Sequence, residues 1–424
     1  MDLVVRQARI WGRDGLWDVA VAGGRYAEIA AVVTARGARD VEAGGRLLAP
    51  AFVDPHIHLD KVLVAEDVRP NRSGTLREAI EILWERKAAY TVEEIVRRAG
   101  PVIESAVLTG TTRIRTHVDV DTIGKLRPLE GVAAARARYR DLVDLEIVAF
   151  PQEGVVRDPG TAELLERAVE AGADLVGGMP HNEASPADSR RHVEICFEVA
   201  LRHDRDIDMH VDETDDPASR TLEIVADLTL ANGYQGRVTA GHTCALAAYP
   251  DDYARRVIEK LARAGVHMIT NPATNLMLQG RLDRQPVRRG ITRVKELLEA
   301  GVNVAMGQDC VKDTFYPFGR ADMLEVALIT AHAAHLSLPP EVETVFAMGT
   351  TRAARVLRTP DYGVEVGHRA DFVLLDAPTP AEAIRLQAAR RLVVRLGRVV
   401  AETAVEQRLH RDGPAAFDAT SVGQ

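Results

Sequence analysis

The segment FVDPHIHLDK, residues 52–61, places His56 and His58 one residue apart at the end of an apolar run. On an extended strand, side chains alternate between the two faces, so both rings would project from the same side. Such a pair is by itself more often structural than metal-binding, but His210 and Asp309 close two other apolar runs. Three nitrogen ligands and one oxygen leave a position for water, as a catalytic Zn²⁺ or Fe²⁺ site requires. The sequence therefore predicts one divalent metal ion held by these four residues.

Hydrolysis at such a site needs proton carriers, because a metal ion supplies hydroxide near neutral pH but not a proton for the leaving group. Glu213 follows His210 by three residues in HVDE and is the predicted general acid/base, the alternative being a solvated loop glutamate. His242, which ends VTAGH, is predicted to orient the hydroxide, although alone it could be a buried histidine bonded to backbone. Asp309 could instead cap a helix after its strand. The predicted catalytic residues are Glu213, His242 and Asp309.

These residues need a scaffold that brings distant segments together. Apolar, β-branched runs alternate with longer amphipathic stretches, which is typical of parallel strands joined by crossover helices. Eight such runs end in polar residues, and they span 52–58, 113–119, 146–153, 174–180, 206–213, 237–242, 267–272 and 303–309. Eight β/α units predict a TIM (β/α)₈ barrel with its active site at the carboxyl ends of the strands. A doubly wound sheet is the main competitor, but no glycine-rich phosphate turn follows the first run.

Both ends of the chain have a different pattern, with short strands separated by glycine turns. We expect residues 1–48 and 359–424 to meet in a small β-sandwich domain, and residues 49–358 to form the barrel. The fold class is therefore α/β. Between the first two barrel strands, a capping box of Thr91 with Glu94 is predicted to open a helix.

Composition limits the class of partner. The net charge of −9 arises from mixed charges without long single-sign runs, which disfavours a nucleic-acid groove or an anionic membrane surface. Cys196, Cys244 and Cys310 form no CxxC pair, and no run is long enough to cross a membrane. We expect a cytoplasmic protein that acts on a small soluble molecule. None of the six lysines lies between Lys125 and Lys260, so a two-metal site bridged by a carboxylated lysine of the middle strands is excluded.

Several motifs together resemble the amidohydrolase superfamily, and within it the bacterial cytosine deaminases of the barrel type. They include PHIHLDK, GTTRIRTHVDVD, AFPQEG, HVDETDD, VTAGHT and GQDCVKDTFYPFGRADML, and the resemblance extends over about residues 45–400. It implies a single ferrous or zinc ion on the four ligands named above and a nucleobase-like substrate. It also implies that Glu213 carries protons to the ring nitrogen and the leaving ammonia, and that Gln152 binds the amide edge of the pyrimidine. Barrels of this kind often assemble, so a homo-oligomer is expected.

Two positions depart from that family's pattern. Cys310 stands where cytosine deaminases usually carry a second aspartate, and Phe315 stands where tryptophan is common. A thiol in place of a carboxylate leaves a smaller, more apolar wall that could admit a 5-methyl group, although Cys310 could also pack behind the eighth strand. In GMPHNEAS, His181 and Asn182 either line the pocket or turn the chain.

The function predicted from these features is hydrolytic deamination of cytosine or of a 5-substituted cytosine such as 5-methylcytosine. An aminotriazine (ammelide-type) substrate is the alternative, because triazine hydrolases similar to this family share RTHVDVD and DLVGG. Those relatives tend to lose the glutamate that is present here as Glu213, which favours a pyrimidine. A scaffold protein built on an inactive barrel would be expected to lack ligands. The sequence leaves open the native metal and the choice among cytosine, 5-methylcytosine, isocytosine, isoguanine, creatinine and a triazine.

Overall fold

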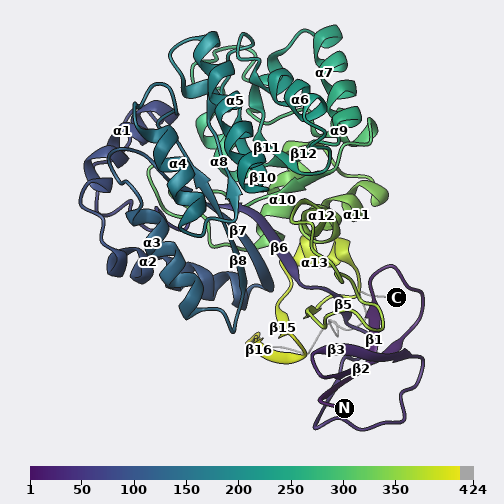
Figure 1. The fold of residues 1–424 in the computed structure, drawn as a ribbon. Coiled ribbons are helices and arrows are strands. Elements are labelled where there is room, and N and C mark those ends of the chain that lie inside the picture. Colours follow the sequence, from purple (N-terminus) through teal and green to yellow (C-terminus); the bar gives the residue numbers. More distant parts are fainter. Residues whose placement is uncertain (411–424) are drawn as a thin grey trace.

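The structure is a computed structural model that describes residues 1–410. Two eight-stranded sheets organise it, one built from both ends of the chain and the other from the strands between them. Figure 1 shows the first and last segments of the chain, in purple and yellow, side by side below a larger body of strands wrapped by helices. Residues 411–424 of the predicted C-terminal segment lie outside the described part of the chain.

The central sheet is a parallel barrel whose strands follow one another in chain order. The last strand returns to the first, because the backbone N–H of Asp309 donates to the carbonyl of His56 at 2.7 Å and the N–H of His58 donates to the carbonyl of Asp309 at 3.2 Å. The strands are β6 (Phe52–Ile57), β7 (Thr111–Asp119), β8 (Asp144–Phe150), β9 (Leu175–Val176), β10 (Asp206–Val211), β11 (Val238–His242), β12 (His267–Thr270) and β13 (Val304–Met306). Each of the eight predicted runs contributes one of them, and the predicted TIM barrel is confirmed.

Amphipathic helices cover the outside of the barrel in Figure 1 and bury their apolar faces on the strands. They are α2 (Val92–Leu108), α3 (Arg127–Arg138), α4 (Thr161–Glu170), α5 (Pro186–His203), α6 (Thr221–Ala231), α7 (Asp251–Ala264), α9 (Val294–Glu299), α10 (Met323–Ala333), α11 (Pro339–Met348) and α12 (Thr351–Val356). The predicted capping box at α2 is only half formed. The Thr91 side chain accepts from the backbone N–H of Glu94 at 3.2 Å, but the Glu94 carboxylate pairs with Arg86 and Arg98 instead of turning back to the cap.

The sheet of the chain ends has its own apolar core, separate from that of the barrel. Its strands are β1 (Leu3–Ile10), β2 (Trp17–Ala22), β3 (Arg25–Ala30), β4 (Arg39–Glu42), β5 (Leu47–Pro50), β14 (Phe372–Leu375), β15 (Arg390–Arg395) and β16 (Arg398–Glu402), and α13 (Pro380–Leu386) joins β14 to β15. β1 changes one of its partners at Gln7, where φ is 54°: β4 pairs with its first half and β5 with its end, while β2 pairs along both parts with a shift of register between them. β1 therefore belongs to two hydrogen-bonded ladders, as expected for the predicted small β-sandwich built from both ends of the chain. The exact boundaries at residues 48 and 358 stay predictions.

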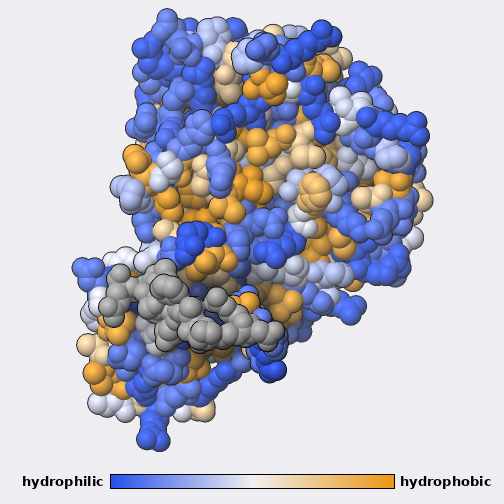
Figure 2. All heavy atoms as spheres, turned by 180° about the vertical axis from the view of Figure 1, so that it is seen from behind, coloured by the Kyte–Doolittle hydropathy of each residue, from blue (hydrophilic) through white to orange (hydrophobic). Residues whose placement is uncertain are grey.

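Two further helices border the cavity at the carboxyl ends of the barrel strands. These are α1 (Leu76–Lys87), which follows β6, and α8 (Pro272–Leu278), which follows β12. Seen from behind in Figure 2, the surface shows hydrophobic patches over the barrel that are bordered by hydrophilic residues. Within residues 1–410, no helix combines the length and apolarity needed to cross a bilayer.

Candidate active site

The four predicted metal ligands meet at the carboxyl end of the barrel. Ligand atoms of His56, His58, His210 and Asp309 all lie within 4.8 Å of one another. The Nε2 atoms of His58 and His210 are 3.0 Å apart, and Asp309 Oδ1 lies 3.4 Å from His58 Nε2 and 3.6 Å from His56 Nε2. All four residues are at most 4% exposed. Residues separated by more than 250 positions in the sequence therefore converge on one buried point.

The chemistry of this donor set fits a divalent cation. Burial lowers the pKa of His58 to about 4 and holds the pKa of His210 well below its ordinary range, so both rings are neutral, which is the form that binds metals. Within the described residues, both ring nitrogens of His56 and Oδ2 of Asp309 have no hydrogen-bond partner. Buried polar atoms without partners are costly, and a cation bound by three nitrogens and one oxygen would satisfy one ring nitrogen of His56 and the carboxylate of Asp309.

Backbone and neighbours hold these ligands in position. The ring of His58 is fixed by a contact between its Nδ1 and the carbonyl of His117 at 3.1 Å, a type of support that orients metal-binding histidines. A Cβ at position 307 would lie 2.7 Å from the Cβ of His56, so only glycine lets the chain just after β13 pass so close to the first ligand. Asp309 itself has φ of 67°, a left-handed conformation that a non-glycine residue adopts at some energetic cost.

Glu213 and His242 lie next to each other beside the ligand cluster. Glu213 Oε1 is 3.2 Å from His242 Nδ1, and the amide nitrogen of Asn275 reaches both, at 3.2 Å from Glu213 and 3.0 Å from His242. On the other side of the His242 ring, the Asn271 amide nitrogen lies 3.1 Å from Nε2. Burial, together with repulsion from Asp309, holds the pKa of Glu213 well above its ordinary range. A buried carboxyl group with a raised pKa is suited to act as an acid as well as a base.

The ligand cluster opens into a small inner cavity that continues into a larger outer one. The inner cavity has a volume of about 20 Å³ and is lined by ligands together with Gln152, Cys310 and Phe315. Three of the five predicted substrate-binding residues therefore surround the space next to the ligands. Phe315 and Phe150 form its apolar walls.

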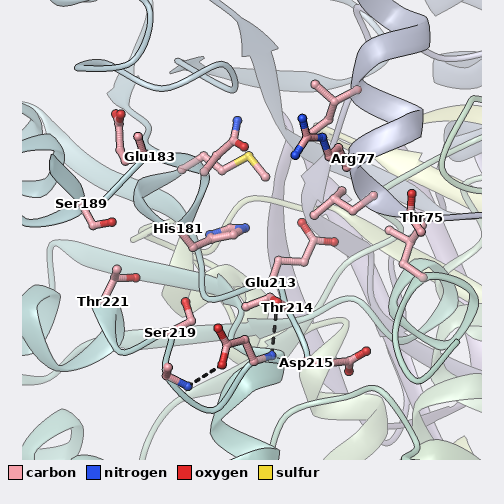
Figure 3. A pocket seen from close by; sticks show the side chains of 18 of the residues that line it. Thr75, Arg77, His181, Glu183, Ser189, Glu213, Thr214, Asp215, Ser219 and Thr221 are labelled. Carbon is pink, nitrogen blue, oxygen red and sulfur yellow. Dashed lines mark hydrogen bonds between the residues drawn. The ribbon is translucent and has the colours of Figure 1, made fainter. Parts of the chain in front are cut away.

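The outer cavity has a volume of about 810 Å³, and Leu76, Met179 and Glu213 line both spaces. Figure 3 shows the ring of His181 and the carboxylate of Glu213 directed into it. His181 and Asn182 line the outer cavity and not the inner one. The side-chain amide of Asn182 donates to the backbone carbonyl of Gln152 at 2.8 Å, so it supports the loop that carries Gln152.

Two groups of site residues escaped the sequence analysis. Asn275 follows Asn271 by one helical turn in NPATN, and that spacing after a strand end is the only signal that they share a face of α8. Lys61 is the second omission: it follows the HxH pair directly, and its ammonium donates to Gln152 Oε1 at 2.8 Å. No local pattern indicates that contact, because the two residues are 91 positions apart.

Comparisons with known proteins agree with this arrangement. Residues 40–401 match the amidohydrolase family. The chain is 33% identical over 417 residues to N-isopropylammelide isopropyl amidohydrolase of Pseudomonas sp. (strain ADP), covering 95% of this chain and 98% of the relative. It is 34% identical over 400 residues to pterin deaminase of Rhizobium rhizogenes, covering 93% and 88%.

Among solved structures, the fold is similar to 5-methylcytosine deaminase from Klebsiella pneumoniae liganded with 5-fluorocytosine. The TM-score is 0.93 at 38% identity, and the match covers 96% of this chain and 99% of that one. The predicted superfamily and the prediction of a hydrolytic enzyme are both confirmed. This family uses a divalent metal ion, and the histidine and aspartate cluster provides a place for one. With its barrel, its ligand cluster and these matches, the chain belongs to the amidohydrolase family.

Proposed function

We propose that this protein is a metal-dependent hydrolytic deaminase of a cytosine-type base, with 5-methylcytosine among its substrates. The observation that carries the proposal is the position of Glu213: a buried carboxyl group lines the inner cavity immediately beside the four ligands. Similarity to the 5-methylcytosine deaminase of Klebsiella pneumoniae over nearly the whole of both chains supports the choice of ring. One ion, either Zn²⁺ or Fe²⁺, would be bound by His56, His58, His210 and Asp309.

Such an ion supplies Lewis-acid chemistry and lowers the pKa of water to near neutrality. The side chains then have distinct tasks in the hydrolysis. Glu213 takes a proton from water and delivers it to the ring nitrogen beside the reacting carbon. The water oxygen forms a new bond to that carbon, the bond to the amino nitrogen breaks, and the amino group leaves as ammonia after Glu213 has carried the second proton. His242, paired with Glu213 at 3.2 Å, holds the attacking oxygen in place together with Asp309.

The inner cavity, of about 20 Å³, has room for about one water, so the ring would lie where it meets the outer cavity, held by side chains that line the inner one. Gln152 binds the amide edge of the pyrimidine, and Phe315 contributes an apolar surface. Burial raises the pKa of the Cys310 thiol well above its ordinary range, so the group stays neutral and acts as an apolar wall, not as a nucleophile. A neutral wall at this position accommodates a 5-methyl group better than a carboxylate would.

An aminotriazine substrate is the second candidate, and its support is the match to N-isopropylammelide isopropyl amidohydrolase over 98% of that relative. Both candidates require loss of an amine from a six-membered nitrogen ring, so the same assay separates them. Ammonia release is measured from cytosine, 5-methylcytosine, isocytosine, isoguanine, creatinine and ammelide, with isopropylamine release from N-isopropylammelide. We expect cytosine and 5-methylcytosine to react fastest. Preference for a triazine would transfer the assignment to the second candidate.

The role of Glu213 is tested by the Glu213→Gln variant. Loss of the proton carrier is expected to lower kcat by about 10²- to 10⁴-fold while the metal content stays at one ion per chain. Glu198→Gln makes the same chemical change on an exposed face of α5, where Glu198 pairs with Arg191, and is the matched control. Retained turnover in Glu213→Gln would rule out the proton-carrier role. A protein purified without stoichiometric metal and inactive on every ring would instead support the scaffold alternative.

A further inference from the structure

A buried lysine lies directly behind the wall of the inner cavity. Lys61 is 1% exposed, and its ammonium donates to Oδ1 of Asp119 and to Oε1 of Gln152, the latter at 2.8 Å. Lys61 itself does not line the cavity, whereas Gln152 does. The ammonium therefore acts on the cavity through the amide of Gln152.

This contact fixes which end of the amide faces a ligand. An ammonium group has three donors and no acceptor, so only the oxygen of the Gln152 amide can lie against it. The amide nitrogen then occupies the other position, where one contact, to Glu153 Oε1 at 3.4 Å, involves one of its two hydrogens. Because Gln152 lines the inner cavity, we infer that the remaining N–H is available there as a donor. A free glutamine side chain could present either end, but this one cannot.

Asp119 keeps the lysine in place. Its Oδ1 accepts from Lys61 and its Oδ2 accepts from the ammonium of Lys87 at 2.8 Å, while its backbone N–H donates to Asp60 at 3.1 Å. Turning Lys61 away from Gln152 would leave a buried ammonium with one partner fewer, which is costly in a water-free interior. The orientation of the amide is thus built into the fold before any ligand arrives.

We propose that Lys61 is a positioning residue that sets Gln152 as a hydrogen-bond donor and thereby selects rings with a carbonyl oxygen at the edge facing Gln152. This inference rests on the proposed function, because it assumes that a nitrogen ring lies against Gln152 at the mouth of the inner cavity. It narrows the substrate class to oxo-substituted azines. A ring with an amino group at that edge would set one donor against another and leave both without an acceptor.

The test compares binding of two pyrimidines to the metal-loaded protein by calorimetry at one fixed alkaline pH. Uracil carries oxygen at both exocyclic positions and 2,4-diaminopyrimidine carries nitrogen at both, so turning the ring over does not exchange the two patterns. Each Kd is measured for every variant, and the ratio of the two is compared with that of the unaltered protein. The two pyrimidines also differ at the exocyclic group that faces the metal, but this difference contributes equally to the ratio in every variant and so does not affect the comparison.

We expect the unaltered protein to bind uracil about tenfold or more tightly than 2,4-diaminopyrimidine. Lys61→Met frees the amide to turn, so the ratio should fall to within about threefold of unity. Gln152→Glu keeps a partner for Lys61 and presents an oxygen to the ring, so the ratio should invert. Lys87→Met is the control for charge: it removes the other ammonium from Asp119 and a donor from Glu153 Oε1, but it leaves the contact between Lys61 and Gln152 in place, so it should keep the original ratio even if it lowers stability.

A ratio that is unchanged in Lys61→Met, or that fails to invert in Gln152→Glu, would overturn the role of Lys61. The second variant decides the matter even if the first does not fold. If the unaltered protein binds neither ring, the proposed function fails and the inference with it. If the unaltered protein binds uracil but the ratio of the two Kd values is the same in both variants, the inference about Lys61 fails while the proposed function stands.

Discussion

Exchange of Cys310 for aspartate should convert the ring preference of this protein. Cys310 is 3% exposed, lines the inner cavity, and has its Sγ atom 3.7 Å from Oδ1 of Asp309. Cys310→Asp places a carboxylate where the neutral thiol stands. A 5-methyl group against that wall would then lose an apolar contact and would also cover a charged oxygen that had been available to water.

The two effects can be estimated separately. An apolar contact for one methyl group is worth about 0.8 kcal/mol. Covering a polar oxygen without giving it a hydrogen bond costs at least about 1 kcal/mol. Together they amount to about 2 kcal/mol, which corresponds to about a 30-fold fall in kcat/KM for 5-methylcytosine relative to cytosine.

Both substrates are assayed by ammonia release on the same preparation, so the ratio of kcat/KM values does not depend on the fraction of folded protein. Cys310→Ser is the control, because it keeps the size and neutrality of the side chain and should change the ratio by less than about threefold. An unchanged ratio in Cys310→Asp, with cytosine still hydrolysed, would refute the placement of the 5-position against Cys310. A ratio that falls equally in both variants would assign the effect to the loss of sulfur rather than to charge.

Three further predictions concern the metal, the proton pathway and pH. Chelation should lower Tm by about 5 °C for a chain of 424 residues if the ion is present at a thousand times its Kd, and Zn²⁺ or Fe²⁺ should restore it; an unaltered melting curve would contradict the metal site. Asn275→Ala should lower kcat about tenfold with unchanged metal content, because the donor to both Glu213 and His242 is lost; normal turnover would show that the pair needs no such support. Burial lowers the pKa of His267 to about 4 in the folded protein, whereas the pKa of an unfolded histidine is about 6.5. The neutral ring therefore stabilises the folded state fully above pH 6.5, and this stabilisation is lost as the pH falls toward 4. Between pH 6.5 and pH 4, the free energy of unfolding should fall by about 3 kcal/mol less in His267→Gln than in the unaltered protein. Urea denaturation at both pH values measures this, and an equal fall in the two proteins would refute the prediction.

Much of the barrel could be predicted from local patterns. Buried parallel strands are apolar throughout, so each run stands out between amphipathic helices, and polar residues at the carboxyl ends indicate where His58 and His210 would meet. Local patterns do not predict a side-chain contact when residues from other parts of the chain compete for the same group. Glu94 has the right spacing for a capping box, but two arginines attract its carboxylate, and no sequence rule weighs these interactions.

The site shows the same division. The ligand residues are predictable because strand order alone brings them together. The donor face of Gln152 is not, because it depends on an ammonium from the loop after β6 and on an aspartate at the end of β7. The position of Asn275 likewise depends on how α8 lies over the barrel mouth. Residues that touch substrate directly are thus easier to infer than those that orient them.

Two buried groups of acidic side chains differ in how their charge is balanced, and this difference shows where a metal ion is needed. Asp119, Asp121 and Glu153 also lie within 4.8 Å of one another, but the ammonium of Lys87 donates to all three, at 2.8, 2.6 and 2.8 Å. Within residues 1–410, Asp309 pairs with imidazoles alone and with no lysine or arginine. A buried carboxylate without a cation costs several kcal/mol. The first group already contains its cation as a side chain, whereas the second must obtain one from solution, and we therefore expect the ion at Asp309.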